Sequence, residues 1–600
     1  MPDATRGTMP TQRVALILAL ATVAFASACP TESPPFIECG NDTHCGLAEG
    51  GHCLANPATG HKFCAYPDQA CAAGLRWSDH DVEDTISGQC VAMPDAGMVD
   101  VTPPTIASRS PDASATGVAR TAAVSVMFSE DIAGATIDAV SFRVVGPGGT
   151  DVAGTLDVLG SNATFAPSVP WTPQSEYTVT IGTQVTDLAG NHLASASTWS
   201  FTTGTATWSA PALLETETNL QASDPVVGSG GGAVVAVWLM SSCNGICQLP
   251  SQVWFAIRSG GAWSPAAPIG GVVGAIGAPV LAVDAAGRAT LVYSATVGSR
   301  ASIYAARYEA GAWSVPALIE TDDTGNATLP AAAVDAGGNA YAVWAQHDGT
   351  RTNIMANRYA IGAGWGAAAP LELATANAEF PHVAAGANGA AFAVWTQGAM
   401  MYGARFTAGA WGQPALAGAG TGKVRVAVDA DGNAIAVWTS GNDIMANRNT
   451  GAWGTAAPID SASAPSLQAF ALAMPDGSAM AVWSQLGDLW HARYTVAGGW
   501  GAALRIENAG GSATDPSLAF APNGAGICAW EQPSPAAAYS PWANLFLPTT
   551  GWGAAQLAKP DDGVTIDSPA AFFDGGDNSF GVVWLAAPSG LRSVYAASLR

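Results

Sequence analysis

"DAGGNAYAVWAQ" at residues 335–346 and "DADGNAIAVWTS" at residues 429–440 are near copies of one phrase. Each copy begins with Asp, Gly and Asn, the residue types that form tight turns between strands. Each continues with alternating small and large apolar residues and reaches a Trp, which is typical of a strand buried on both faces. The phrase therefore predicts a hairpin turn followed by one inner strand of a layered β-structure.

The phrase recurs through the C-terminal two-thirds of the chain. Its closing aromatic is found at spacings of 43 to 55 residues, at Trp238, Tyr293, Trp344, Trp395, Trp438, Trp483, Trp530 and Trp584. A second phrase, "GAWS" or "GWG", has its own series at Trp208, Trp263, Trp313, Trp365, Trp411, Trp453, Trp500 and Trp552. Short strands repeated at this period predict a β-propeller with one blade per repeat, over residues 205–600.

The third repeat can be divided into four strands, at residues 330–336, 339–346, 353–360 and 365–373, which we name A to D. The array opens with a strand-D phrase at residues 208–215 and ends with a strand-C phrase at residues 593–600. The first residues would then supply the outer strand of the last blade and close the ring, leaving no unpaired edges at the ends of the array. We expect eight blades. Seven blades are the alternative, because after an insertion or deletion one copy of the phrase need not belong to a separate blade.

The repeated phrases indicate a structural role for their residues more strongly than a role in binding or catalysis. A Trp in the middle of a strand packs between blades, whereas a sugar platform needs exposed rings. The turn at residues 429–433, "DADGN", resembles a calcium loop, but other copies read "DAAGR" and "MPDGS", with the acids moved or absent. The requirements of a tight turn account for the residues of every copy, whereas calcium binding accounts for only some copies. We therefore expect no metal and no cofactor, with calcium as the alternative.

Strand C carries an arginine in six of the eight repeats. The series is Arg258, Arg307, Arg358, Arg405, Arg448 and Arg493. One interpretation is an inter-blade ion pair with the acid that follows strand D, at Glu215, Glu320, Glu372, Asp460 or Glu507. The other is a ring of guanidinium groups that faces the channel or one surface and suits acidic glycans or carboxylates.

Residues 102–204 show period-two alternation and predict a β-sandwich. Val124, Val126 and Phe128 share one face of a strand. The phrases "SPDASATGV", "VMFSEDI", "TFAPSVPWTPQSEYTVTI", "VTDLAGNHLA" and "WSFTTG" follow in order. This order resembles bacterial Ig-like domains of the S-layer-protein type. The resemblance implies a spacer or display module, and it carries no catalytic residues to transfer.

The N-terminus is typical of an export signal. An apolar run at residues 14–26 is too short to span a bilayer stably, and the "ASAC" that follows resembles a bacterial lipoprotein signal. Residues 1–28 would then be removed and Cys29 lipidated, although Ala26 stands where that family usually has Leu. Plain secretion is the alternative, and Met9 is an alternative start. Residues 29–38 would be a tether. Pro30 after the Cys favours the outer membrane or cell surface of a Gram-negative bacterium.

The remaining cysteines indicate an oxidising compartment. Six of them form a disulfide-rich module at residues 39–90, followed by a linker at residues 91–101: Cys39, Cys45, Cys53, Cys64, Cys71 and Cys90. Three disulfides are expected there, with the pairing left open, and zinc is disfavoured because no Cys-x2-Cys spacing is present. Cys243 and Cys247 are candidates for a further disulfide, and Cys528 is expected to be a buried thiol.

The net charge of −24 argues against nucleic acid as a partner. No nucleophile elbow, His-Glu metal helix or P-loop is present. We therefore expect an all-β, monomeric envelope protein that binds a glycan or protein ligand without catalysis, and no catalytic residue is proposed. A glycan-active hydrolase or lyase and a purely structural spacer are the alternatives.

Overall fold

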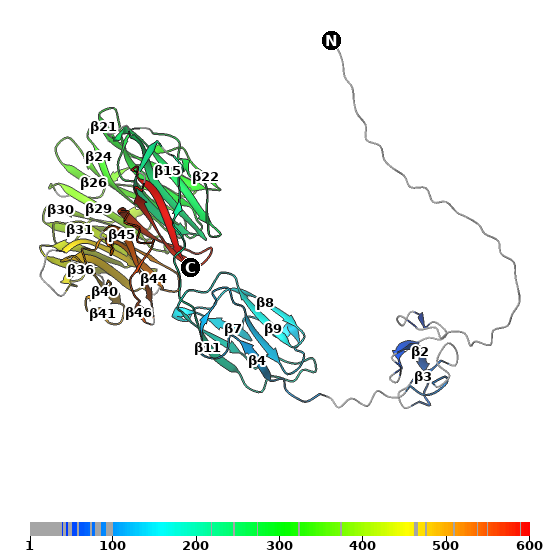
Figure 1. The fold of residues 1–600 in the computed structure, drawn as a ribbon. Helices are drawn as coiled ribbons and strands as arrows, with labels where there is room; N and C mark the ends of the chain where they lie inside the picture. The colour runs from blue at the N-terminus through cyan, green and yellow to red at the C-terminus, as the bar shows by residue number, and fades with distance from the viewer. Residues whose placement is uncertain are drawn as a thin grey trace, which may run out of the picture. The chain divides into compact units, whose positions relative to one another are not determined.

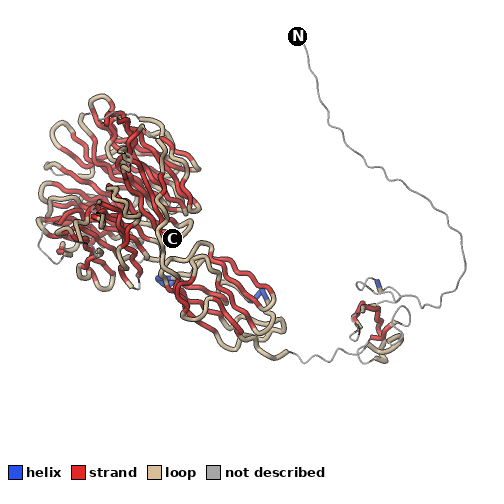
Figure 2. The backbone as a smooth tube through the Cα atoms, viewed as in Figure 1, coloured by secondary structure: helices blue, strands red, loops and turns tan. Residues whose placement is uncertain are grey.

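The computed structural model describes residues 39, 44–45, 51–56, 59, 61–71, 75–78, 86–91 and 100–600, with short gaps at 218, 244–246, 273, 322–323, 373–374, 461–465, 474–476, 508–509, 537, 549 and 589. The side chains of residues 148, 243, 247–250 and 466–473 also lie outside the description. The chain divides into two compact units, Met1–Val101 and Thr102–Arg600. In both, the described elements are strands joined by loops, with short 3-10 turns such as Gly134–Thr136 and Pro147–Gly149 (Figure 2).

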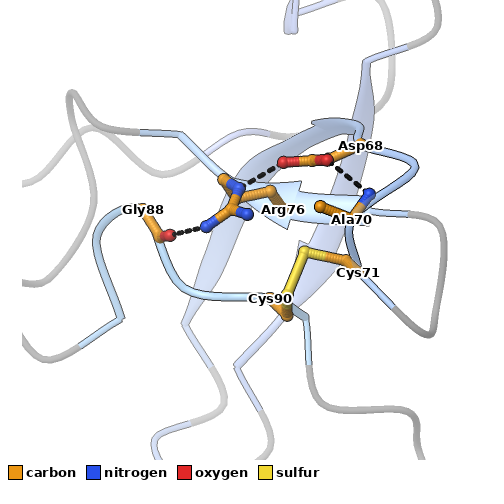
Figure 3. The surroundings of a disulfide bond; sticks show 6 residues. All are labelled: Asp68, Ala70, Cys71, Arg76, Gly88 and Cys90. Atoms are coloured by element: carbon orange, nitrogen blue, oxygen red, sulfur yellow. Dashed lines mark hydrogen bonds and ion pairs between the residues drawn. A yellow bond between two sulfur atoms is a disulfide. The ribbon is translucent and has the colours of Figure 1, made fainter.

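The first unit is a small sheet held by disulfides. Its strands are β1 (His52–Ala55), β2 (Lys62–Pro67) and β3 (Leu75–Trp77), in the order β1-β2-β3. The six cysteines pair as Cys39–Cys53, Cys45–Cys64 and Cys71–Cys90, which confirms three disulfides. Figure 3 shows the last of these beside Arg76, which binds the carboxylate of Asp68 and the carbonyl oxygen of Gly88. The buried apolar side chains are few, with Phe63, Ala65 and Trp77 at the centre, so covalent links replace much of a core.

The second unit begins with a sandwich of two four-stranded sheets, ordered β5-β11-β10-β7 and β4-β6-β9-β8. Its strands are β4 (Ile106–Ser110), β5 (Ala115–Val118), β6 (Val124–Phe128), β7 (Phe142–Val145), β8 (Gly154–Leu159), β9 (Asn162–Pro167), β10 (Glu176–Ile181) and β11 (Ser197–Thr203). The predicted alternation is confirmed, because Val124, Val126 and Phe128 are all buried in the core between the sheets.

The described residues that follow form eight sheets, one for each predicted blade (Figure 1). The A strands, innermost in each blade, are β13 (Leu220–Gly230), β18 and β19 (Ala275–Ile276 and Val280–Val283), β24 (Ala327–Val334), β29 (Ala378–Ala385), β34 (Val424–Val428), β38 (Ser466–Ala473), β43 (Thr514–Phe520) and β48 (Ile566–Asp574). The B strands are β14 (Ala233–Cys243), β20 (Ala289–Val297), β25 (Ala340–His347), β30 (Ala391–Gln397), β35 (Ala434–Ser440), β39 (Ala479–Gln485), β44 (Gly526–Pro533) and β49 (Ser579–Ala586). The C strands are β15 (Cys247–Ser259), β21 (Arg300–Glu309), β26 (Thr352–Ala360), β31 (Met400–Thr407), β36 (Asp443–Asn449), β40 (Asp488–Thr495), β45 (Tyr539–Leu547) and β50 (Ser593–Leu599).

Strand D differs from the expectation of one continuous strand. In the third blade it consists of β27 (Gly364–Trp365) and β28 (Ala369–Pro370), which both pair with β26 but in registers that differ by one residue. The amide of Asn357 causes part of this break, because its Nδ2 donates to Gly366 O at 3.0 Å and to Ile319 O of the preceding blade at 2.9 Å. The other outer strands are β16 (Ala262–Trp263), β17 (Ala267–Pro268), β22 (Ala312–Trp313), β23 (Ala317–Leu318), β32 (Ala410–Trp411), β33 (Ala415–Ala419), β37 (Ala457–Pro458), β41 (Gly499–Trp500), β42 (Leu504–Arg505), β46 (Gly551–Trp552) and β47 (Gln556–Leu557).

The ring closes as the sequence predicts. Strand β12 (Ala212–Leu213) pairs with β50, with Ala212 opposite Ala596 and Leu213 opposite Tyr595. The N-terminal end of the array thus supplies the outer strand of the eighth blade. The innermost strand of that blade, β48, contacts β13 of the first blade, and Figure 1 shows the red C-terminal strand beside the green strands of the first blade.

The B strands form the core between blades. Every residue of β30 and β39 is buried, and in the third blade Ala340, Tyr341, Ala342, Val343 and Trp344 are all inaccessible to solvent. The aromatic series that closes the repeated phrase is buried in every blade, with Trp584 and Tyr293 exposed by only 1%. The series is therefore a packing feature, because a ring that stacks on a sugar must reach solvent.

Candidate functional site

The arginine series lies between blades. Arg258 and Arg307 are buried, and the other four side chains are half-buried near the C–D turn of their blades. Arg307 places its guanidinium carbon 4.3 Å from the ring of Tyr359 in the next blade. Three more arginines stack in the same way on the next blade's strand C: Arg358 on Phe406, Arg448 on Tyr494 and Arg493 on Phe546. These contacts join neighbouring blades through cation–π attraction.

The two remaining arginines, Arg258 and Arg405, do not stack on an aromatic residue of the next blade. The aromatic that Arg405 would meet is replaced by Asn449, and Arg405 lies over Phe392 of its own blade. Arg258 turns to the eighth blade, where it donates to Asp574 at 2.7 Å and to Asp577 at 2.6 Å. Five members of the series thus contact a neighbouring blade, and one of them, Arg258, contributes to ring closure.

The acids that follow strand D do not have the role that we expected. Glu320 lies 3.4 Å from Arg300, Glu372 lies 3.5 Å from Arg351 and Glu507 lies 2.6 Å from Arg505. None of these three partners belongs to the arginine series. The strands are antiparallel, so the end of strand D and the end of strand C lie at opposite ends of a blade, which separates the expected partners.

The aspartates of the A–B turns bind their own turns. Asp429 Oδ1 accepts from the Asn433 amide at 2.8 Å, and its Oδ2 accepts from the Asn433 side chain at 3.0 Å. Asp335 and Asn339 repeat the arrangement. A turn-forming role therefore accounts for these residues, and the acidic loop at 322–323 lies outside the description.

The structure describes only some of the cysteines outside the disulfide-rich module. Cys528 is a free thiol, fully buried, and burial raises its pKa. Cys243 and Cys247 stand opposite each other in the backbone register of β14 and β15, but their side chains lie outside the description, so their disulfide stays a prediction. Cys29 also lies outside the described residues.

The centre of the ring holds two cavities. One, of about 570 Å³, is enclosed by the A–B turns and lined by small residues such as Gly230, Ala285 and Gly386. The other, of about 520 Å³, lies at the opposite end of the A strands, where these strands begin. Most of its lining is apolar, but it also contains His382, Lys423 and Arg425.

These cationic groups stand out when the blades are compared position by position. In each blade, one residue of strand A pairs with the residue immediately before the strand-B aromatic, and these strand-A residues form one layer around the channel. The layer consists of Val226, Val280, Ala331, His382, Arg425, Phe470, Ser517 and Ala570. Only the fourth and fifth blades place a nitrogen-bearing side chain in this layer, and the two blades are neighbours. Lys423 precedes Arg425 by two residues and is exposed.

Strand β34 of the fifth blade is built differently from its equivalents. In five other blades strand A has a register shift, at a residue with positive φ that precedes a proline: Asp224, Leu329, Phe380, Asp515 and Ser568. Strand β34 has no such proline and pairs without a shift from Val424 to Val428. The run "GKVRV" at residues 422–426 therefore brings two cations to the opening where other blades place a bulge.

His382 joins the two strands. Its Nδ1 accepts a hydrogen bond from the amide of Val426 at 3.3 Å, which places the proton of the neutral ring on Nε2. Burial, with the charge of Arg425, lowers the pKa of His382 to about 3, so the ring is neutral at physiological pH. Arg425 donates to Val424 O at 3.0 Å, and burial lowers its pKa, although a guanidinium stays protonated.

The cations have no acidic partner in the described part of the chain. No carboxylate oxygen there lies within the 4.0 Å of an ion pair from Lys423 or Arg425. Residues 461–475, which include the neighbouring inner strand, contain no Asp or Glu. Lys423 is exposed and Arg425 is half-buried, so the opening carries two positive charges that no described acid neutralises, and it favours an anion.

Carboxylates also gather on the seventh and eighth blades. Glu531 accepts from Thr514 Oγ1 at 2.9 Å, and burial, with the charges of Asp515 and Asp567, raises its pKa. Asp567 is paired with Arg592 at 3.1 Å. Among the described residues that line the cavity no carboxylate is present, so these acids are not placed to act on a molecule inside it.

A space of about 940 Å³ lies between the sandwich and the propeller, and it is lined by residues such as Arg120, Asp577 and Arg600. Asp577 already binds Arg258 and Arg600, and Asn578 donates to Pro170 O at 2.7 Å across this boundary. Its polar groups are thus engaged in contacts between the two domains, and we place the candidate site in the channel.

Residues 100–203 match the family model of a bacterial Ig-like domain. This match confirms a bacterial Ig-like domain at the residues where the sequence predicted one, and the S-layer-protein type stays a prediction. None of the curated proteins matches the chain. Among the described residues, no helix has the length and apolar character that crossing a membrane requires.

Three solved structures illustrate the likeness of the repeats to propellers. The propeller domain of the Trilobed protease from Pyrococcus furiosus is 10% identical, with 57% of this chain and 99% of that chain covered and a TM-score of 0.36. The BP39L lectin from Burkholderia pseudomallei is 15% identical, with 52% and 92% covered and a TM-score of 0.36. An ulvan lyase, described as a new polysaccharide lyase family, is 11% identical, with 58% and 98% covered and a TM-score of 0.37. At these scores the likenesses carry no argument about ligand or activity, and the propeller assignment rests on the strand pairing itself.

Proposed function

We propose that this chain is a surface-displayed bacterial binding protein whose propeller takes up an anionic group of a glycan or protein ligand. The ligand would enter the central channel at the opening lined by His382, Lys423 and Arg425. The observation that carries the proposal is the pair of neighbouring cations in an otherwise apolar cavity, with no acidic partner among the described residues. The chain has a net charge of −24, so most of its surface repels anions. Cations that lie away from acids mark a site that attracts them.

The remaining parts fit display. Export and lipidation at Cys29 would anchor the chain at the outer membrane or cell surface, and the tether, disulfide module and Ig-like domain would carry the propeller. The cavity lining supports binding over hydrolysis, since glycoside hydrolysis typically uses a pair of carboxylates beside the bound sugar and the described lining contains none.

The test is a titration of the full chain with three anionic probes: inorganic phosphate, glucuronate and an acetylated tripeptide acid. We expect at least one probe to bind saturably by calorimetry and to raise the unfolding midpoint by mass action. The double variant Lys423→Ala, Arg425→Val should abolish this binding. Valine is the residue of the same channel layer in the first two blades, so the substitution suits the fold.

Arg143→Ala serves as the matched control. It removes one positive charge from an exposed pair with Asp151 in the Ig-like domain, and it should bind the probes like the unmodified chain. Saturable binding that persists in the double variant, or no binding by any of the three probes, would contradict the proposal.

A further inference from the structure

The lining of the cationic opening points to one class of anion. We infer that the group bound there is a carboxylate attached directly to an apolar body, as at the C-terminus of a peptide that ends in an apolar residue. The inference rests on the proposed function, because it specifies the ligand of the same opening.

The donors match a single carboxylate. Arg425 offers a planar fork that can bind both carboxylate oxygens, Lys423 adds a flexible ammonium at the rim, and His382 presents a neutral ring with its proton on Nε2. A carboxylate has about four acceptor positions, which this set of donors can fill. The donors come from the adjacent strands β29 and β34, so they can converge on one small group.

The surroundings of these donors are apolar. Leu329 and Phe380 line the same cavity beside the cations, Val226 and Val280 belong to the layer that holds His382 and Arg425, and Leu281 also lines the cavity. Leu329 is 50% exposed and both it and Phe380 have φ near +50°, a conformation that large apolar residues rarely adopt. The conformation belongs to the bulge that five blades share, and in the third and fourth blades this bulge places a large apolar side chain at the opening.

The same lining is unsuited to a sugar. Hydroxyl groups that leave water must find new hydrogen-bond partners, and each unpaired group costs affinity. Among the described residues around the cavity, Ser517 supplies the only side-chain hydroxyl, and there is no carboxylate or amide. A uronate would keep its charge neutralised but would bury its hydroxyls against valine, leucine and proline.

The rim is also unsuited to a polyanion. The bulge position that carries Leu329 and Phe380 in the third and fourth blades carries Asp224 in the first and Asp515 in the seventh. These acids stand at the equivalent position of two other blades and repel extended negative charge at the rim. A ligand with one carboxylate and no further negative charge avoids that repulsion.

The test compares four probes by calorimetry on the full chain. They are the peptide acetyl-Ala-Ala-Phe as the free acid, the same peptide as the C-terminal amide, octanoate and glucuronate. We expect the peptide acid to bind at least about tenfold more tightly than the amide, which lacks the charge, and than glucuronate, which lacks the apolar body. Octanoate distinguishes the source: binding equal to that of the peptide acid would support the class and assign a free apolar acid in place of a peptide end.

A variant separates the apolar contact from the charge. Phe380→Asn introduces a residue that tolerates positive φ but removes the ring. The variant should therefore bind the peptide acid roughly tenfold more weakly and should bind glucuronate with unchanged affinity. Circular dichroism and the unfolding midpoint would show that the variant is folded, and Arg143→Ala is again the control. Glucuronate binding more tightly than the peptide acid would overturn this inference and leave the proposed function intact. Failure of every anionic probe would overturn both.

Discussion

The guanidinium of Arg258 in the first blade binds the carboxylate of Asp574 in the eighth blade at 2.7 Å, and neither side chain is exposed by more than 2%. The pair spans the seam where the two ends of the array meet. The same guanidinium also binds Asp577 and the carbonyl oxygen of Gly261. The seam is therefore held by a buried charge network as well as by the strand pairing of β12 with β50.

Replacing Arg258 by methionine should destabilise the propeller strongly. The substitution leaves Asp574 buried without its cation, and burial already raises the pKa of this carboxyl. Removing one partner of a buried pair costs about 3–5 kcal/mol of unfolding free energy. Chemical denaturation followed by tryptophan fluorescence measures the loss.

Two further variants show whether the buried charge is the cause. The double variant Arg258→Met, Asp574→Leu should recover part of the loss, because no unpaired charge remains. Arg143→Met breaks an exposed pair and should cost less than about 1 kcal/mol. Equal losses for Arg258→Met and Arg143→Met would show that the seam does not depend on this network.

Deleting residues 593–600 should destabilise the whole ring. The deletion removes β50, its pairing with β12 and the buried side chains of Val594 and Ala596. It also removes the acceptor of the bond from Leu214 N to Val594 O, at 2.9 Å. The blades next to the seam then expose unpaired edges and apolar faces, so we expect a lower denaturation midpoint and concentration-dependent association on a sizing column. A truncated chain that unfolds at the same denaturant concentration as the full chain would contradict closure.

The repeats allowed the blades, their number and the permuted closure to be predicted, because each of these follows from the order of phrases along the chain. Contacts between blades were harder to predict. The pairing of Arg307 with Tyr359 depends on which end of a neighbouring strand C lies opposite, and the expected acids are at the other end of the blade. The antiparallel order of strands C and D could have excluded those acids.

The candidate site could not be predicted from the repeats, because it lies where one copy departs from the others. Lys423 is one of three lysines in the chain, and it occurs with Arg425 in the one well-described strand A that has neither proline nor register shift. That departure was visible in the sequence. The partnership with His382 was not, because it requires knowing that residues 43 positions apart occupy the same layer of a channel.

The contact of Arg307 with Tyr359 should be measurable as a coupling energy. Arg307 is 5% exposed, and a desolvated cation over an aromatic ring contributes about 1–2 kcal/mol. In a double-mutant cycle, Arg307→Met and Tyr359→Leu should couple by about that amount of unfolding free energy. The control cycle pairs Arg307→Met with Tyr494→Leu, a tyrosine in another blade, and should be additive within about 0.5 kcal/mol. Additivity in both cycles would show that the stacking adds nothing to stability.

His491 should make stability depend on pH. It occupies the position that holds Ala446 or Gly403 in neighbouring blades, and its ring packs 5.7 Å from that of Trp552. Burial lowers its pKa from the usual 6.5 to about 4. The unfolded chain therefore binds a proton at higher pH than the folded chain, so the contribution is fully present above pH 6.5 and is lost as the pH falls toward 4. The slope is about 1.4 kcal/mol per pH unit for one proton, on the order of 3 kcal/mol over the window.

The variant His491→Ala isolates this contribution, because alanine is the residue of most other blades at this position. His382 titrates in an overlapping window, and carboxylates affect both proteins below pH 5, so the informative quantity is the difference between the two stability curves. Urea denaturation at pH 7.5, 6.0, 5.0 and 4.5 gives that difference. At each step below pH 6.5, we expect the unfolding free energy of the unmodified chain to fall by more than that of the variant. The difference in slope should be about 1.4 kcal/mol per pH unit, the value for one proton. Parallel curves would mean that His491 is hydrated in the folded protein and that the packing of blades six and seven is looser at this point than the structure shows.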